Sequence, residues 1–168
     1  MEDEDFKIIN LNNNELKVFR DGRVCAKYIY KTNSKYGRKG DIKWSLRKAE
    51  LIKGYNRIGL YNKRKEKRYL IHRIVAYAFL GLDINNSKIY IDHIDRNKQN
   101  NNWLNLRIVT NQQNQFNTKA KGYSWSKRYC KFDARIGLNG KVIHLGLFEK
   151  EEDARDAYLE AKKILHII

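Results

Sequence analysis

The sequence predicts a mixed α+β protein, on three observations. Short alternations of apolar and polar residues, typical of half-buried strands, recur along the chain. Two segments, 70–79 and 154–165, instead place apolar residues at helical spacing. Turn dipeptides such as Asn139-Gly140 join alternating runs, as in antiparallel hairpins. We therefore expect antiparallel strands with few helices, in two domains that cover residues 1–118 and 119–168.

The N-terminal part of the chain is expected to be rich in β structure. Leu16–Val24 reads as a hairpin that turns at Asp21-Gly22, a dipeptide that favours tight turns. Asn56–Leu60 and Tyr69–Ile71 are expected to be further strands, separated by a very basic turn over 63–68.

Two stretches of this region have other patterns. Residues 30–53 are polar, basic and weakly periodic, which leaves open a loop or a short helix near 48–52. Residues 70–79 predict a helix with an apolar face. His72 lies on that helix, and we expect it to pack or to contact phosphate rather than to act in catalysis. The acidic residues 2–5 are expected to be a solvated terminus.

A group of polar residues follows this helix. Residues 88–92 alternate as a strand does, so His93 is expected at a strand end. A loop rich in asparagine leads to a second strand at Leu106–Val109. Thr110 and Gln113 then form the pattern of a capping box, which predicts a helix start. Asn114 is therefore expected in the first turns of that helix, where the positive helix end favours a phosphate.

These residue types suit the cutting of phosphodiester bonds. A nuclease needs a base to deprotonate water and a divalent cation to hold the charge that builds on the phosphate. His93 can be the base, while Asp92 and Asn114 offer hard oxygen ligands that suit magnesium better than zinc. The alternative for His93 is an ordinary loop histidine, and the matched spacing of these groups favours the nuclease site.

The segment Asp92-His93-Ile94-Asp95, with Asn105 and Asn114 at fixed distances, resembles the HNH homing endonucleases of phages, viruses and mobile introns. The resemblance implies a ββα-metal core over about 88–118, with His93 as general base and Asp92 and Asn114 as metal ligands. It implies that Asn105 supports the loop structurally, and that manganese can substitute for magnesium. Arg96 and Trp103 depart from the family pattern and put the loop conformation in question.

The C-terminal part of the chain predicts a hairpin covered by a helix. Apolar and polar residues alternate on both sides of Asn139-Gly140. Alanines at helical spacing over 154–161 let a helix lie close on the apolar face. Counting outward from the turn gives four expected cross-strand pairs: Leu138 with Lys141, Ile136 with Ile143, Ala134 with Leu145, and Phe132 with Leu147. Arg135 and His144 are expected to pair on the opposite, exposed face.

Residues 121–125, 131–136, 144–148 and 151–158 resemble the APETALA2-type DNA-binding domain, a three-stranded sheet packed on one helix. The resemblance implies a sheet that lies in the major groove, where arginines read base edges. The expected DNA-binding residues share this sheet and its turns: Lys121, Ser124, Ser126, Arg128, Lys131, Arg135, Lys141 and His144. Trp125 is either a contact with DNA or a core residue. The alternative for the whole module is a small protein-binding unit.

The charge of the chain indicates a polyanionic partner. There are 35 Lys and Arg against 19 Asp and Glu, a net charge of +16. The segment 35–73 carries 14 basic and three acidic residues, so we expect it to track phosphates, with a solvated charged surface as the alternative. No long apolar run, amphipathic basic helix or signal peptide appears, which argues against a membrane.

The two cysteines, Cys25 and Cys130, lack the spacing of a structural zinc site, so none is expected. We expect an intracellular protein that is not secreted, and a monomer without an obligate protein partner.

The function predicted is a magnesium-dependent endonuclease of a mobile element that acts on double-stranded DNA and, with one active site, nicks one strand. Two alternatives remain open. One is a catalytically inactive, sequence-specific DNA-binding regulator, which a nicking assay with and without magnesium separates. The other is an RNA-binding or RNA-cutting protein, which competition between duplex DNA and RNA separates, because A-form RNA hides its major groove.

Overall fold

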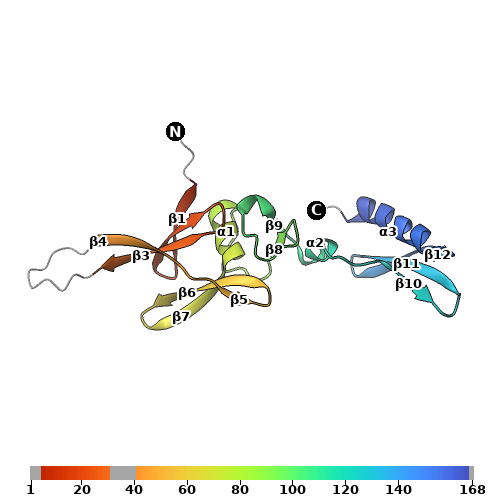
Figure 1. Ribbon diagram of the computed structural model, residues 1–168, viewed down its shortest axis with the longest axis horizontal. Coiled ribbons are helices and arrows are strands. Elements are labelled where there is room, and N and C mark those ends of the chain that lie inside the picture. Colours follow the sequence, from red (N-terminus) through yellow and green to blue (C-terminus); the bar gives the residue numbers. More distant parts are fainter. Residues whose placement is uncertain (1–4, 31–40, 167–168) are drawn as a thin grey trace, which may run out of the picture. The chain divides into compact units, whose positions relative to one another are not determined.

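The structure is a computed structural model that describes residues 5–30 and 41–166 (Figure 1). It is a mixed α+β fold of antiparallel strands and few helices, which confirms the predicted class. The chain forms two compact units, 1–108 and 109–168. The predicted domain limit at 118/119 stays a prediction. The acidic residues 2–4 and residues 31–40 of the polar stretch lie outside the described residues.

Over residues 5–30 and 41–108, the first unit contains three sheets and one α-helix. A four-stranded antiparallel sheet has the order β1-β2-β3-β4, a three-stranded sheet has the order β5-β6-β7, and β8 pairs with β9. The elements are β1 (Phe6–Leu11), β2 (Asn14–Phe19), β3 (Val24–Tyr30), β4 (Asp41–Leu46), β5 (Glu50–Ile52), β6 (Tyr55–Asn62), β7 (Lys65–Leu70), α1 (Ile71–Phe79), β8 (Tyr90–His93), the short 3-10 helix η1 (Trp103–Asn105) and β9 (Leu106–Val109).

Two local expectations for this unit are wrong. The short helix considered near 48–52 is instead strand β5, which pairs with β6 through Leu51 and Asn56. The basic turn is shorter than predicted, because β7 already begins at Lys65. Only Lys63 and Arg64 make the reversal, with φ values of 43° and 70°, and this left-handed pair closes a two-residue hairpin.

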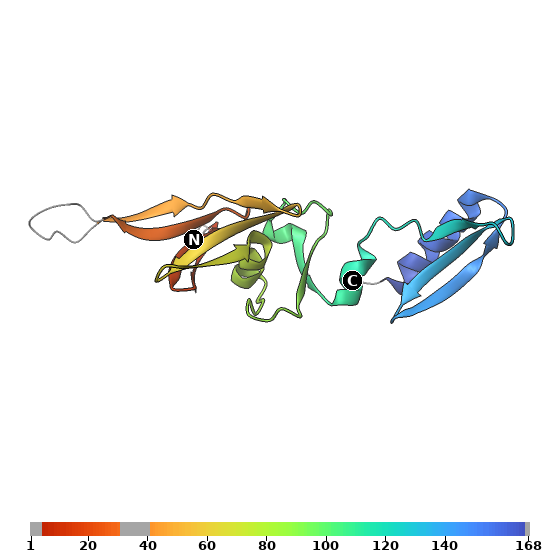
Figure 2. The same ribbon diagram turned by 90° about the horizontal axis from the view of Figure 1, so that it is seen from below.

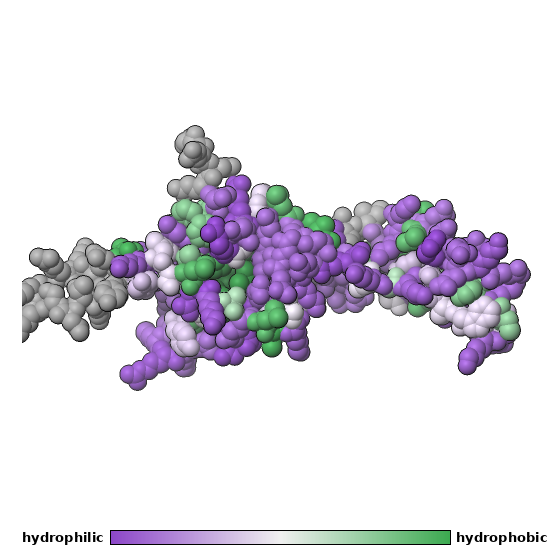
Figure 3. All heavy atoms as spheres, viewed as in Figure 1, coloured by the Kyte–Doolittle hydropathy of each residue, from purple (hydrophilic) through white to green (hydrophobic). Residues whose placement is uncertain are grey.

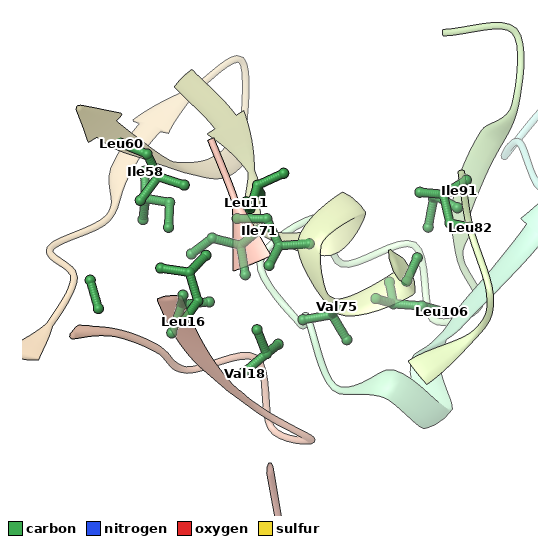
Figure 4. Close-up of a cluster of buried hydrophobic side chains, with 14 residues drawn as sticks. Leu11, Leu16, Val18, Ile58, Leu60, Ile71, Val75, Leu82, Ile91 and Leu106 are labelled. Carbon is green, nitrogen blue, oxygen red and sulfur yellow. The ribbon is translucent and has the colours of Figure 1, made fainter. Parts of the chain in front are cut away.

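Helix α1 lies at the centre of the first unit's core (Figure 4). Its Ile74, Val75 and Ala76 are fully buried and pack with residues from several strands. Figure 4 shows Leu16 and Val18 of β2, Ile58 and Leu60 of β6, and Ile91 and Leu106 of the β8–β9 pair around the helix. One helix thus joins the N-terminal sheets to the strand that carries the Asp92-His93 motif.

The turn of the β2–β3 hairpin also touches the asparagine-rich loop. The Trp103 amide donates to the Arg20 carbonyl oxygen at 2.9 Å. Gly22 has φ +96°, and a Cβ built on it would lie 2.6 Å from the Asn101 Cβ. The hairpin predicted around Asp21-Gly22 is therefore present, and its glycine permits a close approach to the loop.

The second unit consists of α2 (Asn111–Phe116), β10 (Tyr123–Ser126), β11 (Lys131–Leu138), β12 (Lys141–Phe148) and α3 (Glu151–Leu165). The strands form an antiparallel sheet in the order β10-β11-β12, and α3 packs on one face of it (Figure 2). Ala134 and Ile136 of the sheet are buried together with Ala154 and Tyr158 of the helix.

The predicted hairpin register holds only near its turn. Leu138 lies opposite Lys141 and Ile136 opposite Ile143, as predicted. Beyond them the register shifts between Ala134 and Arg135, so that Ala134 lies opposite Gly146 and Phe132 opposite Phe148, and the two outer pairs predicted with Leu145 and Leu147 are wrong. The cause is a β-bulge on β12, where Gly146 has φ +144°.

Within the second unit, α2 is tied to the end of α3. The Phe116 and His166 rings stack with centroids 3.8 Å apart and planes within 7°. His166 Nε2 lies 3.0 Å from the Gly137 carbonyl oxygen, and Lys162 Nζ donates to the Thr118 carbonyl oxygen at 3.2 Å. Removing residues 121–168 would therefore also remove partners of α2, so point substitutions test the C-terminal sheet more cleanly than truncation does.

The exposed face drawn in Figure 3 is mostly hydrophilic, with separate hydrophobic patches. Within the described ranges, none of the helices combines the length and apolar character needed to cross a bilayer.

The contact between Gly22 and Asn101 makes a stability prediction. Gly22→Ala should lower the free energy of unfolding by about 3 kcal/mol, because it adds backbone strain at positive φ and a steric clash with the loop. Gly81→Ala is the matched control, since Gly81 also has positive φ but no atom within 4 Å of a built Cβ. That control should cost about 1 to 2 kcal/mol. Denaturant unfolding measures both, and equal losses would show that the close approach is unimportant.

Candidate active site

His93 is the last residue of strand β8 and is buried, with 4% of its surface exposed. Its ring meets two other rings of the first unit, His72 of α1 and Tyr55 of β6. Burial lowers the pKa of His93, and this outweighs the opposing effects of the Asn101 side chain, Asp95 and Asp92. A neutral imidazole at neutral pH is the form that can accept a proton.

Asp92 precedes His93 and is also buried, with 7% of its surface exposed. Its Oδ2 accepts hydrogen bonds from Arg107 Nε at 2.9 Å and Arg107 Nη2 at 2.7 Å. Arg107 lies on β9, the strand that pairs with β8. A guanidinium thus neutralises this carboxylate within the first unit. Arg107 was not predicted from the sequence, because strand pairing rather than sequence spacing brings it to Asp92.

Asn105 holds the loop between β8 and β9. Its Oδ1 accepts from the Asp95 amide at 3.0 Å, and its Nδ2 donates to Asp95 Oδ1 and to the Asn100 carbonyl oxygen, both at 2.9 Å. Its own carbonyl oxygen accepts from the Ile94 amide. Hydrogen bonds led by that from Asn100 lower the pKa of Asp95. These contacts are those that a loop-supporting residue would make.

Asn114 lies on α2, which belongs to the second unit. The predicted capping box is present: Thr110 Oγ1 accepts from the Gln113 amide at 3.2 Å, and Gln113 Oε1 accepts from the Thr110 amide at 3.0 Å. Asn114 therefore lies in the first turns of a helix whose N-terminus is capped.

The donors present fit a hard divalent cation. Asp92 supplies a carboxylate and Asn114 an amide oxygen, the ligand types of magnesium. Across residues 5–30 and 41–166, three or more His, Cys, Asp or Glu side chains never gather as a metal cage. Magnesium usually keeps several waters and takes phosphate oxygens beside one or two protein ligands, so each of these side chains has the chemistry to contribute to a magnesium site.

The C-terminal sheet brings five of the predicted DNA-binding residues to the face opposite α3. Side chains alternate between the two faces of a sheet, and the cross-strand register places these five on the same face. They are Ser124, Ser126, Lys131, Arg135 and His144. Asp133 lies among them, buried, and accepts from Arg135 Nε at 3.0 Å. His144 Nε2 lies 3.2 Å from its Oδ1. The hydrogen bond from Arg135 is the largest cause of the lowered pKa of Asp133.

Three predicted residues lie elsewhere in this unit. Lys121 precedes β10 and forms an ion pair with Glu151 at 3.1 Å. Arg128 lies in the β10–β11 turn over the Tyr129 ring. Lys141 shares its register position with Leu138, so it is not on the face of Arg135. Trp125 is 51% exposed and meets Phe132 edge-on, which places it at the margin of the sheet rather than in the core.

Residues 69–116 match the HNH endonuclease family. An uncharacterised HNH endonuclease of Acanthamoeba polyphaga mimivirus is 33% identical over 116 residues, 67% of this chain and 31% of the relative. The DNA endonuclease I-HmuI of Bacillus phage SP01 is 41% identical over 70 residues, 41% of this chain and 38% of the relative. A putative HNH homing endonuclease of a Bacillus subtilis prophage is 44% identical over 62 residues, 36% of this chain and 35% of the relative. The chain thus spans less than half of each of these relatives.

Among solved structures, that of I-HmuI with DNA resembles this chain with a TM-score of 0.48 and 31% identity, over 66% of this chain and 56% of that chain. The chain contains an HNH endonuclease domain, and relatives of that domain are named as DNA endonucleases.

The contacts of Asn105 generate a prediction. Asn105→Ala removes an amide that holds Asp95 and Asn100, so the free energy of unfolding should fall by about 1 to 3 kcal/mol. Asn97→Ala is the control, because Asn97 lies in the same loop but its side chain accepts only from the Gln99 amide at 3.1 Å. Chemical denaturation of both variants is the measurement. A loss for Asn105→Ala no larger than the control's would show that its amide does not hold the loop.

Proposed function

We propose that this chain is a magnesium-dependent HNH endonuclease of a mobile element, which nicks one strand of double-stranded DNA. The observation that carries the proposal is the Asp92-His93 pair at the end of β8, within the segment that matches the HNH family. Both residues are buried, and burial favours the neutral form of His93. A base and a carboxylate thereby follow one another at the end of a strand that is buried in the first unit.

In the proposed mechanism His93 takes a proton from the water that attacks phosphorus in line. Asp92 and Asn114 would hold the cation. When bound, magnesium supplies positive charge that stabilises the departing 3′ oxygen. Asn105 keeps the loop after His93 in place through its three side-chain hydrogen bonds. The products would carry 5′-phosphate and 3′-hydroxyl ends.

Substrate binding would come from the basic surfaces. The net charge of +16 favours a polyanion. We propose that the Arg135 face of the C-terminal sheet contacts duplex DNA as an APETALA2-type sheet does, and that segment 35–73 contacts phosphates. Asp133 holds the Arg135 guanidinium from behind, which leaves the side chain 60% exposed and oriented. One active site in a monomer would cut one strand.

A second candidate is supported by the ion pair between Arg107 and Asp92. Because an arginine already neutralises the proposed metal ligand, the chain could be a DNA-binding regulator without nuclease activity. Conversion of supercoiled plasmid to open circle, with magnesium or manganese and with a chelator, separates the two. Metal-dependent nicking supports the endonuclease. DNA binding without nicking in either metal supports the regulator.

His93→Ala tests the base. The variant should lose cleavage by at least about 100-fold while its affinity for DNA stays nearly intact, because a general base contributes to the transition state more than to binding. Single-turnover nicking and a binding titration are the two measurements. A variant that still cuts at an appreciable rate would show that another group is the base.

Asp92→Ala and Asn114→Ala test the cation site. Each should raise the magnesium concentration needed for half-maximal nicking, because each removes one oxygen ligand. Asp83→Ala is the charge-matched control for Asp92→Ala, since Asp83 is exposed in a loop after α1. If neither Asp92→Ala nor Asn114→Ala changes the magnesium titration, the proposed site is wrong.

Two substitutions test the C-terminal sheet. Arg135→Ala should cost about 1 to 3 kcal/mol of binding free energy on a site selected from a random library, and less on a scrambled site. Lys131→Ala should weaken both alike and flatten the salt dependence of binding. Titrations at several salt concentrations measure this. An Arg135→Ala variant with unchanged preference would place recognition in another part of the chain.

A further inference from the structure

The ring of His72 packs directly against the proposed base. His72 is the second residue of α1 and is 5% exposed. Its ring centroid lies 5.1 Å from that of His93, with an angle of 82° between the planes. Tyr55 lies against both, at 5.2 Å from His72 and 6.0 Å from His93. Edge-to-face rings at these distances attract one another and hold a fixed relative orientation.

A buried ring nitrogen of His72, Nδ1, lacks a hydrogen-bond partner in the described part of the chain. Burial, followed by the charges of His93 and Arg73, lowers the pKa of His72 to about 3. The side chain is therefore uncharged at neutral pH, and its ring packs against those of Tyr55 and His93.

The position of His72 is itself tightly set. It stands between Ile71 and Ile74 on a helix whose inner residues are fully buried in the core of the first unit. A side chain held by such packing has little rotational freedom. The backbone of His93 is less constrained, since this residue ends a strand and is followed by a loop. The helix can therefore fix the ring at the strand end.

We propose that His72 is a positioning residue for the nuclease reaction: its ring, fixed by α1, holds the His93 ring in the orientation that the base requires. This inference rests on the proposed function. Displacement of a catalytic base by about 1 Å can lower the reaction rate on the order of 100-fold. The contact of the His72 ring with His93 should therefore have a measurable effect on turnover.

Three substitutions separate the ring from its nitrogens. His72→Phe keeps a ring and removes the buried polar atom, so kcat should stay within about threefold of wild type and the melting temperature should rise. His72→Ala and His72→Asn remove the ring, and Asn keeps a polar group near the Nδ1 position. Both should lower kcat at least about tenfold and leave KM within about twofold.

Val75→Ala is the control, since Val75 is buried on the same helix and forms part of the same core. It should lower the melting temperature without a comparable fall in kcat. Full activity in His72→Ala would overturn the proposal. So would an active His72→Asn beside an inactive His72→Phe, which would assign the role to a hydrogen bond. A rise in KM with unchanged kcat would assign it to a contact with phosphate.

A second readout does not depend on cleavage. The chain has four histidines, so the His93 ring signals can be assigned by NMR with labelled histidine. In His72→Ala the His93 ring signals should shift and broaden, and in His72→Phe they should stay sharp. Unchanged His93 signals in His72→Ala would refute the positioning contact. If wild type does not cut DNA but the signals respond as expected, the proposed nuclease function fails while the contact between the rings stands.

Discussion

The packing of α1 between the N-terminal sheets and strand β8 is the constraint on which the first unit depends. Its buried residues join β2 and β6 to the β8–β9 pair in one core. Because β8 ends at His93, the same packing that stabilises the unit also buries the proposed base. Burial favours the neutral imidazole and the neighbouring rings limit its motion. Gly22 and Arg20 extend this support to the loop after His93, so the β-rich N-terminal segment is part of the body that forms the site.

An arginine near the proposed site and an arginine on the C-terminal sheet each form an ion pair with an aspartate. Arg107 neutralises Asp92 in the first unit, and Asp133 holds Arg135 and lies beside His144 in the second. An ion pair with a buried carboxylate fixes the plane of a guanidinium group. Asp92 and Asp133 are the buried carboxylates that do this for Arg107 and Arg135. The link between Phe116 and His166 has a related consequence, because it makes the helix that carries Asn114 part of the C-terminal unit.

Local signals predicted much of this arrangement. The capping box at Thr110 and the turn at Asn139-Gly140 are present because each depends on a few neighbouring residues. The β-bulge at Gly146 and the strand at Glu50 were not predicted, since bulges and weakly periodic edge strands are decided by pairing with distant segments. The same limit applies to the ion pair between Asp92 and Arg107 and to the ring contact between His72 and His93. Asp133 could have been found, because alternation places it on the face of Lys131 and Arg135.

The proposed reaction is hydrolysis of DNA by a water molecule that is activated at the Asp92-His93 motif. The most direct test is to nick DNA with magnesium in water enriched in oxygen-18, and to analyse the new ends by mass spectrometry. If water attacks phosphorus, each new 5′-phosphate should carry one oxygen-18 atom, and the 3′-hydroxyl ends should be unlabelled. New ends that carry a 3′-phosphate, or 5′-phosphates without the label, would contradict the proposed reaction.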